Sequence, residues 1–477
     1  MSSSLYNSIQ HFNELGVKKI EERIKKFISE GKDIADLILG LNEDLMQLGR
    51  DIITEVLEDM DEFLRQDGIR KKDWEIVRKD ETGLLTTFGQ IRYKRTYFKP
   101  KHGGKRKYLV DELVGLKPHD RMSADVVINT LDEAIESSYR KAGEKASYEN
   151  EVSKQAVMNK VHTAEVNPPK LEYSEKRDVR ILYIEADEDH VAQQAKGKGG
   201  TRCLMPKLIY VHEGIDLSRS TARRKVLKNV RYFGEDCSSE DLWLQVAQYI
   251  SEQYDEDKIE TVYISGDGAS WIKQGLNWIG KSRFVLDNHH LNKYIKVATA
   301  HLDDEAIYQG LKDALDWPDK EMAHRVFNRI LELTENETKI AAVKDARKYI
   351  MNNWAGIAIK AEKGYEIVGC SAEGHVSHVL SNRLSSRPKG WSKTGVNQMT
   401  KLLVYKKNGG NIYDLVMFQK EQERLVQKEE IQDEIIRGMR RSGIRYESSF
   451  NVDLPAIHGG HKTGLYHALR KLVGKCS

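Results

Sequence analysis

ILYIEADEDH at residues 181–190 and VYISGDG at residues 262–268 are the two stretches that decide the fold. Each is an apolar run that ends in acidic residues, which predicts a buried strand with carboxylates at its end. A carboxylate beside a glycine suits a hard divalent cation, because the glycine lets a ligand approach the backbone. Asp187 and Asp267 are therefore candidate metal ligands. The alternative for Asp267 is a simple N-cap of the helix that follows.

The sequence around these stretches alternates between strand and helix patterns. The order β-β-β-α-β-α-β predicts a mixed α/β sheet and matches the ribonuclease-H-like fold. The expected strands are 179–186, 204–212, 225–233, 260–265 and 283–286, and the expected helices are 239–254 and 269–276.

The first acidic position has three candidates. Alternation along a strand places Glu185, Asp187 and Asp189 on one face. Three crowded carboxylates repel each other unless a metal neutralises them or some of them face water. We choose Asp187 as the ligand, and Glu185 and Asp189 remain the alternatives.

Further acids follow the fifth strand. Asp287 and His290 are three residues apart and would share a helix face, which suits a hydrogen-bonded pair or a phosphate contact. The sequence from there to about residue 360 is almost wholly helical and is interpreted as an insertion. Glu373 lies in the first turn of the helix expected after it, where this fold would require a third metal ligand.

The charge of the chain is unevenly distributed. The 76 Lys and Arg residues exceed the 73 Asp and Glu residues by only three, yet the 40 residues from Gly374 to Tyr413 contain no acid. Bases without acids beside candidate metal ligands suit a polyanionic substrate, and Trp391 could stack on an unpaired base. The alternative is a basic helix and loop without a ligand.

The N-terminal part of the chain is expected to bind DNA and to assemble. Helical periodicity over residues 5–64 predicts a helical hairpin, either packed on the rest of the chain or joining protomers. Residues 83–98 predict a β-hairpin, followed by the basic loop 101–107. Ser153 is placed to cap a helix to His162 that suits a recognition helix or an ordinary surface helix. The predicted DNA-binding residues are Lys154, Gln155, Asn159, Lys160, Arg223, Arg224, Arg383, Arg387, Lys389, Trp391 and Lys393.

Several protein classes are excluded. The chain has no run of 18 apolar residues and no signal-peptide pattern at its start, which argues against a membrane or secreted protein. Its four cysteines are far apart, so we expect a reducing compartment and no structural zinc site.

We divide the chain into N-terminal helices (1–70), hairpin and helix-turn-helix-like region (71–170), first core part (171–290), helical insertion (291–360), last core part (361–410) and helical tail (411–477).

Together these residues resemble a known family, the bacterial insertion-sequence transposases of the ISLre type, which are related to Mutator-like and other DDE transposases. The resemblance spans most of the chain. The motifs that carry it are IEADEDHV (184–191), SGDGA (265–269), LDNHH (286–290), EGHV (373–376), LSNR (380–383) and RPKGW (387–391).

The resemblance implies a multidomain α+β protein with a ribonuclease-H-like core interrupted by a helical insertion. It implies Asp187, Asp267 and Glu373 as catalytic and metal-binding residues, with Asp287 and His290 as a supporting Cys/Asp-x-x-His signature. The expected activity is strand cleavage and strand transfer with two Mg²⁺ ions, for which Mn²⁺ can substitute.

The partners implied are double-stranded DNA, as terminal inverted repeats and target, and further copies of the chain in a synaptic complex. No membrane and no small-molecule substrate are expected, and the expected location is the bacterial cytoplasm, at the nucleoid when DNA is bound. The alternatives are a transposase-derived DNA-binding regulator without catalysis, and a structure-selective nuclease or resolvase.

Overall fold

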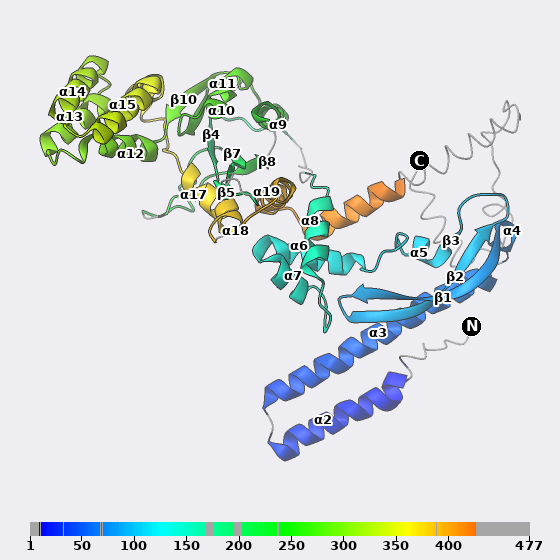
Figure 1. Cartoon of the computed structure of the whole chain (residues 1–477). Helices are drawn as coiled ribbons and strands as arrows, with labels where there is room; N and C mark the ends of the chain where they lie inside the picture. Colours follow the sequence, from blue (N-terminus) through cyan, green and yellow to red (C-terminus); the bar gives the residue numbers. More distant parts are fainter. Residues whose placement is uncertain are drawn as a thin grey trace, which may run out of the picture. The chain divides into compact units, whose positions relative to one another are not determined.

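The computed structural model describes residues 9, 11–31, 33–66, 68, 70–167, 175–194, 203–222, 224–235, 238–387 and 389–425. The chain divides into two compact units (Figure 1). Unit 1 lies within 1–133, 140–154 and 416–477, and unit 2 within 134–139 and 155–415. Within the described ranges, no helix combines the length and the apolar character needed to cross a membrane.

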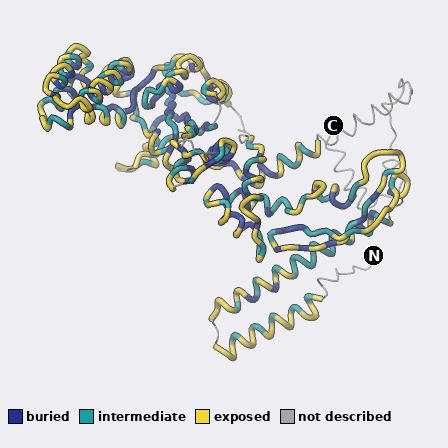
Figure 2. The backbone as a smooth tube through the Cα atoms, in the orientation of Figure 1, coloured by how far each residue is buried: buried dark blue, intermediate teal, exposed yellow. Residues whose placement is uncertain are grey.

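Unit 1 begins with the helical hairpin that the periodicity predicts. Lys19 and Arg23 of its first long helix both pair with Asp44 of the second, at 2.6 and 2.7 Å, and Asp44 is buried. The first long helix itself has no fully buried residue (Figure 2). The elements are the π-helical turn η1 (Phe12–Gly16), α2 (Val17–Glu30) and α3 (Ile34–Gln66).

The β-hairpin of unit 1 is longer than predicted. It consists of β1 (Trp74–Thr86) and β2 (Gly89–Pro100), with the short β3 (Lys107–Tyr108) beside β2. The sequence predicts strands only within 83–98, because residues 75–79 are exposed and therefore lack the apolar alternation of a half-buried strand. The hairpin packs on α3, where Asp61 accepts hydrogen bonds from the Thr96 amide and hydroxyl at 2.7 and 2.6 Å.

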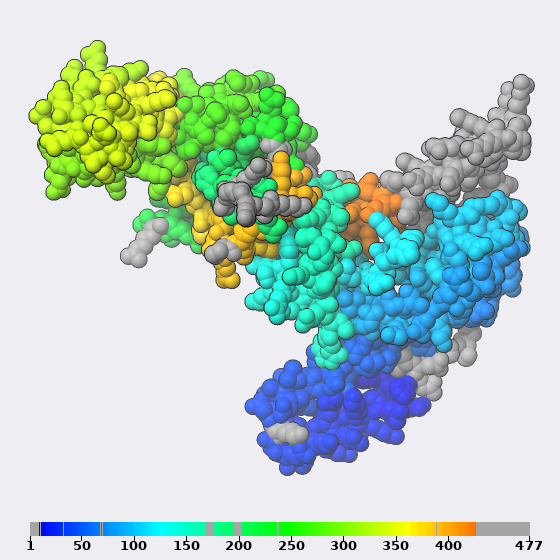
Figure 3. All heavy atoms as spheres, in the orientation of Figure 1, coloured from blue at the N-terminus to red at the C-terminus, as the bar shows by residue number. Residues whose placement is uncertain are grey.

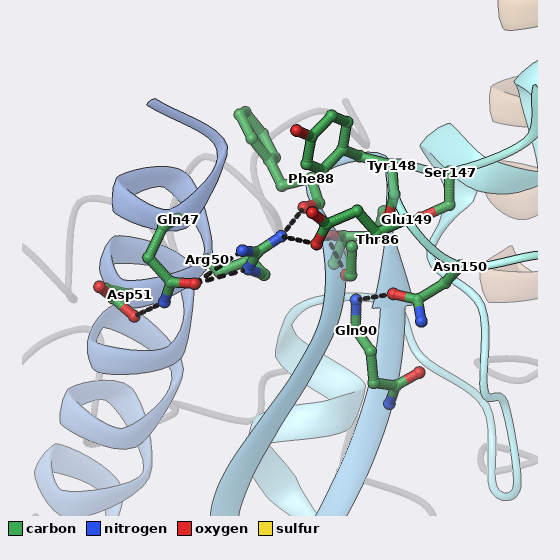
Figure 4. A network of polar contacts seen from close by, with 11 residues as sticks. Gln47, Arg50, Asp51, Thr86, Phe88, Gln90, Ser147, Tyr148, Glu149 and Asn150 are labelled. Carbon is green, nitrogen blue, oxygen red and sulfur yellow. Dashed lines mark hydrogen bonds and ion pairs between the residues drawn. The ribbon is translucent and has the colours of Figure 1, made fainter. Parts of the chain in front are cut away.

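The tip of the hairpin is fixed to α3 by Arg50 (Figure 4). The Arg50 guanidinium donates to the Phe88 carbonyl at 2.8 Å and lies 3.7 Å from the Glu149 carboxylate. Gly89 has a φ of 118°, and a Cβ atom there would lie 2.8 Å from Arg50 Nη1. The turn therefore requires glycine, since a side chain would be strained and would displace the guanidinium.

One helical turn, α4, lies between α3 and the hairpin, and four helices follow the hairpin before residue 167. They are α4 (Arg70–Asp73), α5 (Leu109–Leu113), α6 (Ala124–Glu136), α7 (Tyr139–Lys145) and α8 (Lys154–Thr163). The predicted recognition helix is α8, which buries Val157 and Val161 as expected, whereas Ala156 is only half-buried.

Unit 2 contains a five-stranded mixed sheet in the order β10-β9-β4-β7-β8. The pairs β4–β9 and β9–β10 are parallel, whereas β4–β7 and β7–β8 are antiparallel. The elements are β4 (Ile181–Glu188), β7 (Lys207–His212), β8 (Arg231–Glu235), α9 (Ser239–Gln253), β9 (Thr261–Gly266), α10 (Ser270–Lys273), α11 (Gly275–Trp278) and β10 (Ser282–Leu286). A separate two-stranded sheet pairs β5 (Val191–Ala192) with β6 (Cys203–Leu204).

The predicted third strand, 225–233, is misplaced. Strand β8 begins only at Arg231, because Asn229 adopts a left-handed conformation with φ 53° and breaks the extended chain. Residue Leu227 instead forms an isolated bridge with Ile215. The predicted second strand, 204–212, is likewise divided between β6 and β7.

The helical insertion is present and packs on the sheet. Its first four helices form one closely packed block (yellow-green in Figure 3), and they share a core with Ile184 and Ile264 of the sheet and Trp243 of α9. Side chains of Asp287, Asp304, Asp319 and Asn336 cap the N-termini of these helices. The helices are α12 (Asn288–Thr299), α13 (Glu305–Asp316), α14 (Lys320–Leu333), α15 (Glu337–Asn352) and α16 (Trp354–Lys363).

The last part of unit 2 returns to the sheet. It comprises α17 (Ala372–Val376), the π-helical η2 (Ser377–Ser381), α18 (Asn382–Leu384) and α19 (Lys393–Lys407). Helix α19 packs closely on β8, since a Cβ atom on Gly234 would lie 2.9 Å from Val404. The helical pattern continues to residue 425, and the rest of the predicted tail lies outside the described residues.

Candidate active site

The register of the three parallel strands aligns the ends that carry acids. Both Glu185 of β4 and Val285 of β10 pair with Ser265 of β9. Two positions further along, the same row contains residue 187 of β4 and residues 267 and 287, which each lie one position past the end of β9 and of β10. Because the strands are parallel, this row lies at one edge of the sheet.

The three residues of that row are Asp187, Asp267 and Asp287. The negative charge of Asp267 contributes to a raised pKa at Asp187, so these two carboxylates are close neighbours. The structure therefore brings together two of the predicted ligands and the predicted supporting aspartate. We call Asp187, Asp267 and Asp287 the carboxylate row.

His290 faces the carboxylate row. Its Nδ1 atom lies 3.0 Å from Asp287 Oδ2, and Asp287 also accepts from the His289 amide at 3.1 Å as the cap of α12. The hydrogen bond to Asp287 raises the pKa of His290, and the charges of Asp267 and Asp187 raise it further. The Asp–His pair predicted from the spacing is thus formed, and the imidazole is close enough to all three carboxylates for their charges to raise its pKa.

Asp187 is a weaker acid than an ordinary aspartate. Burial is the main cause and raises its pKa to about 6, and the charge of Asp267 acts in the same direction. Each of these two aspartates uses Oδ1 to accept one backbone N–H, from Glu188 at 2.9 Å and from Ala269 at 2.8 Å. Among described residues, neither forms an ion pair with Lys, Arg or His within 4.0 Å.

Replacement of Asp187 by Asn is expected to stabilise the metal-free protein. The ionised form is disfavoured in the fold, so stability is lost as pH rises from about 4 to about 6, and the loss persists above that range. Asp187→Asn should therefore gain on the order of 2 kcal/mol at pH 7 and nothing below pH 4. Urea unfolding in EDTA at both pH values measures this difference, and an equal effect at the two would contradict it.

The insertion supports the loop that carries Asp267. The Tyr349 hydroxyl of α15 donates to the Asp267 carbonyl. Gly268 has a φ of 87°, and a Cβ atom there would lie 2.3 Å from the side-chain Oδ1 atom of Asn353. Sequence reasoning missed Tyr349 and Asn353, because nothing in a helical segment 80 residues away indicates contact with this loop.

Glu373 does not join the carboxylate row. Its side chain is 62% exposed and its Oε2 atom lies 3.2 Å from His289 Nε2. In the part of the chain that the structure describes, no three His, Cys, Asp or Glu side chains are grouped so as to hold a metal ion. The predicted three-carboxylate ligand set is therefore not assembled in this conformation.

Glu185, an alternative first ligand, is instead a buried anchor. Its Oε1 atom lies 3.0 Å from His212 Nε2, and its Oε2 atom accepts from the Tyr210 hydroxyl and from the amide and hydroxyl of Ser371. His212 Nδ1 accepts from the Gly214 amide, so a neutral His212 carries its proton on Nε2 and donates it to Glu185. Burial opposes ionisation of Glu185, but these hydrogen bonds outweigh it and lower its pKa.

Asp189, the other alternative, is also engaged by protein. Its Oδ1 atom accepts from the hydroxyls of Ser381 and Ser385 at 3.0 and 2.8 Å, and the residue is buried. Of the three candidates for the first ligand, Asp187 is the one beside Asp267.

Two predicted DNA contacts have to be corrected. Trp391 is buried, and its Nε1 atom donates to the Leu384 carbonyl at 2.9 Å. Arg383 is buried as well, lies 4.9 Å from the Trp391 ring and donates to the Ala134 carbonyl. Both side chains therefore hold protein segments together instead of facing a substrate.

The other predicted DNA contacts lie nearer the surface. Arg224, Arg387 and Lys393 are exposed, Lys389 is half-buried, and Arg223 lies outside the described residues. Of the four predicted contacts on α8, Lys160 is half-buried and the other three are exposed, namely Lys154, Gln155 and Asn159.

Comparison with known proteins identifies relatives over nearly the whole chain. The family described as "Uncharacterised protein family (UPF0236)" matches residues 27–421. A UPF0236 protein of Caldanaerobacter subterraneus subsp. tengcongensis is 40% identical over 477 residues, covering 99% of each chain. A second from that organism is 40% identical over 449 residues, covering 93% of each chain. A "UPF0236 protein in vanSb 3'region" of Streptococcus gallolyticus is 26% identical over 411 residues, covering 82% of this chain and 86% of the relative.

Proposed function

The chain belongs to the UPF0236 family, and we propose that it is a DDE-type transposase that cleaves and joins DNA at the ends of an insertion sequence. The observation that carries this proposal is the carboxylate row at the carboxyl ends of β4, β9 and β10. It lies on a sheet with the strand order β8-β7-β4-β9-β10. That order is the one expected of a ribonuclease-H-like core, in which acids on the first and fourth strands hold metal.

Asp187 and Asp267 fit a divalent cation. They are adjacent carboxylates without a cationic partner within 4.0 Å among described residues, and burial raises the pKa of Asp187, with a smaller contribution from their repulsion. A bound cation relieves such repulsion. Asp187 and Asp267 would hold Mg²⁺, and Glu373 would complete the set once it leaves His289. When bound, Mg²⁺ supplies Lewis-acid activation of the attacking oxygen and charge stabilisation of the leaving oxygen.

The remaining polar groups of the site position DNA. His290 carries a raised pKa and a fixed orientation from Asp287, so its protonated imidazole suits a phosphate oxygen. The Tyr349 hydroxyl and the Asn353 contact hold the loop that carries Asp267. The proposal requires no covalent protein intermediate, because water or a DNA 3′-hydroxyl is the nucleophile.

The names of the relatives agree with a mobile element. The name of one relative contains eleven locus designations from a single organism. Such repetition within one genome is expected for an insertion sequence that has moved by transposition.

Two other functions share the DNA partner: a DNA-binding regulator without catalysis, and a structure-selective nuclease or resolvase. One assay separates all three. Supercoiled plasmid bearing the element ends is incubated with the protein and Mg²⁺ or Mn²⁺, then scored for binding, nicking and joined product. Joined product supports the transposase, nicking without joining supports the nuclease, and binding alone supports the regulator.

The basic loop at residues 101–107 is the part of unit 1 best suited to DNA phosphates. Lys101, His102, Lys105 and Arg106 are all exposed around two glycines of positive φ. Exposed basic side chains on a glycine-containing turn suit contacts to DNA phosphates, and such contacts have no sequence preference.

Neutralising this loop is expected to weaken DNA binding in a salt-dependent way. In the double variant Lys105→Gln with Arg106→Gln, the slope of log K against log salt should fall by about 1.8, since each phosphate contact adds about 0.9. Filter binding across a salt series measures the slope. The matched control changes two exposed lysines of the insertion, Lys320 and Lys344, to Gln, and an equal loss in the control would contradict the assignment.

A further inference from the structure

A cavity of about 220 Å³ lies beside the carboxylate row in unit 2. Its charged lining residue is Lys360 of α16, and Asn288, the first residue of α12, lies next to it. Asn288 follows Asp287 directly, so the cavity adjoins the row. Cys370 also lines the cavity.

Two side chains that line this cavity, Lys360 and Asn288, carry N–H donors. The Lys360 ammonium donates to Asn288 Oδ1 at 2.5 Å. An ammonium group has no acceptor, so the amide oxygen must face it and the Asn288 NH₂ group is left to donate elsewhere. Lys360 and Asn288 thus offer donors from two different helices to an acceptor-rich ligand.

The charge of Lys360 is only partly compensated, because the charges of Asp287 and Asp316 act on it without an ion pair. Within the described ranges, no carboxylate lies within 4.0 Å of its ammonium, and both oxygens of the nearby Asp287 already accept from His289 and His290. Burial raises the pKa of Cys370, which keeps its thiol neutral. Burial also lowers the pKa of Lys360 to about 8, and the charges of Asp287 and Asp316 oppose this effect only in part.

We propose that the Lys360–Asn288 cavity binds a phosphate group of the DNA backbone, next to the phosphate at the carboxylate row. The inference rests on the proposed function for the identity of the ligand. The chemistry follows from the cavity: a half-buried cation recognises a phosphate oxygen more strongly than it would in water, and the exposed Asn288 amide beside it adds a donor. Free phosphate has the same chemistry, so the test includes it.

The test measures the acylation rate of individual lysines in the full-length wild-type protein by mass spectrometry. Lys363 of the same helix is the internal reference. The probes are a phosphodiester oligonucleotide, the same oligonucleotide with uncharged methylphosphonate linkages, and inorganic phosphate. The phosphodiester should slow acylation of Lys360 by about tenfold relative to Lys363, and the methylphosphonate should not.

Each other outcome overturns the inference. Equal rates with and without phosphodiester would show that no phosphate occupies the cavity, and protection by inorganic phosphate alone would assign the site to the free ion. Protection by the methylphosphonate would show recognition of bases or sugars.

Two variants separate this inference from the proposed function. Asp267→Asn should lose cleavage and retain protection of Lys360. Lys360→Met should weaken oligonucleotide binding about tenfold, whereas Lys363→Met should not. Cleavage by the wild type without protection of Lys360 would overturn the phosphate site alone, and protection without any cleavage would overturn the proposed activity alone.

Discussion

Asp267→Asn is expected to reduce strand cleavage in Mg²⁺ by at least about a thousandfold and to leave DNA binding intact. The substitution removes a charge from the pair that would hold the cation, and a bound metal contributes several kcal/mol to charge stabilisation. A loss of about 4 kcal/mol corresponds to that factor in rate. The measurements are nicking of supercoiled plasmid and gel shift with the same DNA.

The matched control for this experiment is Asp303→Asn. Asp303 is exposed and has a φ of 49°, a conformation that Asn tolerates well. It should cleave at the wild-type rate. Wild-type cleavage by Asp267→Asn would refute the assigned site, and loss of DNA binding in that variant would point to misfolding.

Glu185→Gln is expected to destabilise unit 2 by about 3 kcal/mol. The carboxylate accepts from His212, Tyr210 and Ser371 through both oxygens, whereas an amide presents an NH₂ group to one set of these donors. Leaving buried donors without an acceptor costs about 1–3 kcal/mol for neutral groups and more beside a charge. Urea unfolding followed by the buried Trp243 measures the loss.

The control for Glu185 is Glu188→Gln on the same strand. Glu188 is half-buried, and its replacement should change the free energy of unfolding by less than about 0.5 kcal/mol. If Glu185→Gln were as stable as Glu188→Gln but failed to bind Mn²⁺, Glu185 would be a ligand and not an anchor.

Much of the sheet is predictable because its strands obey simple patterns. Apolar runs ending in acids locate β4 and β9, and the spacing of Asp287 and His290 predicts their pairing. Strand β8 was misplaced because the left-handed Asn229 leaves no mark in an apolar alternation.

The parts of the site that were not predicted depend on distant contacts. Alternation places Glu185 and Asp187 on one face equally well, and only Tyr210 and Ser371 distinguish the anchor from the residue beside Asp267. Trp391 between two lysines suits base stacking as well as burial, and its contact with the Leu384 carbonyl decides for burial. Glu373 lies in a five-residue helix, whose side-chain direction no periodicity determines.

The anchor at Glu185 has a consequence for biosynthesis. Its bond to the Ser371 amide joins residues 186 positions apart in the chain. During translation, β4 is made long before Ser371, so Glu185 lacks two of its donors until the insertion has also been synthesised. Contacts of such long range slow folding and expose incomplete chains to misfolding. Chains that end before residue 371 contain all five strands but leave the buried Glu185 carboxylate without its Ser371 donors, so we expect them to hold the sheet less stably.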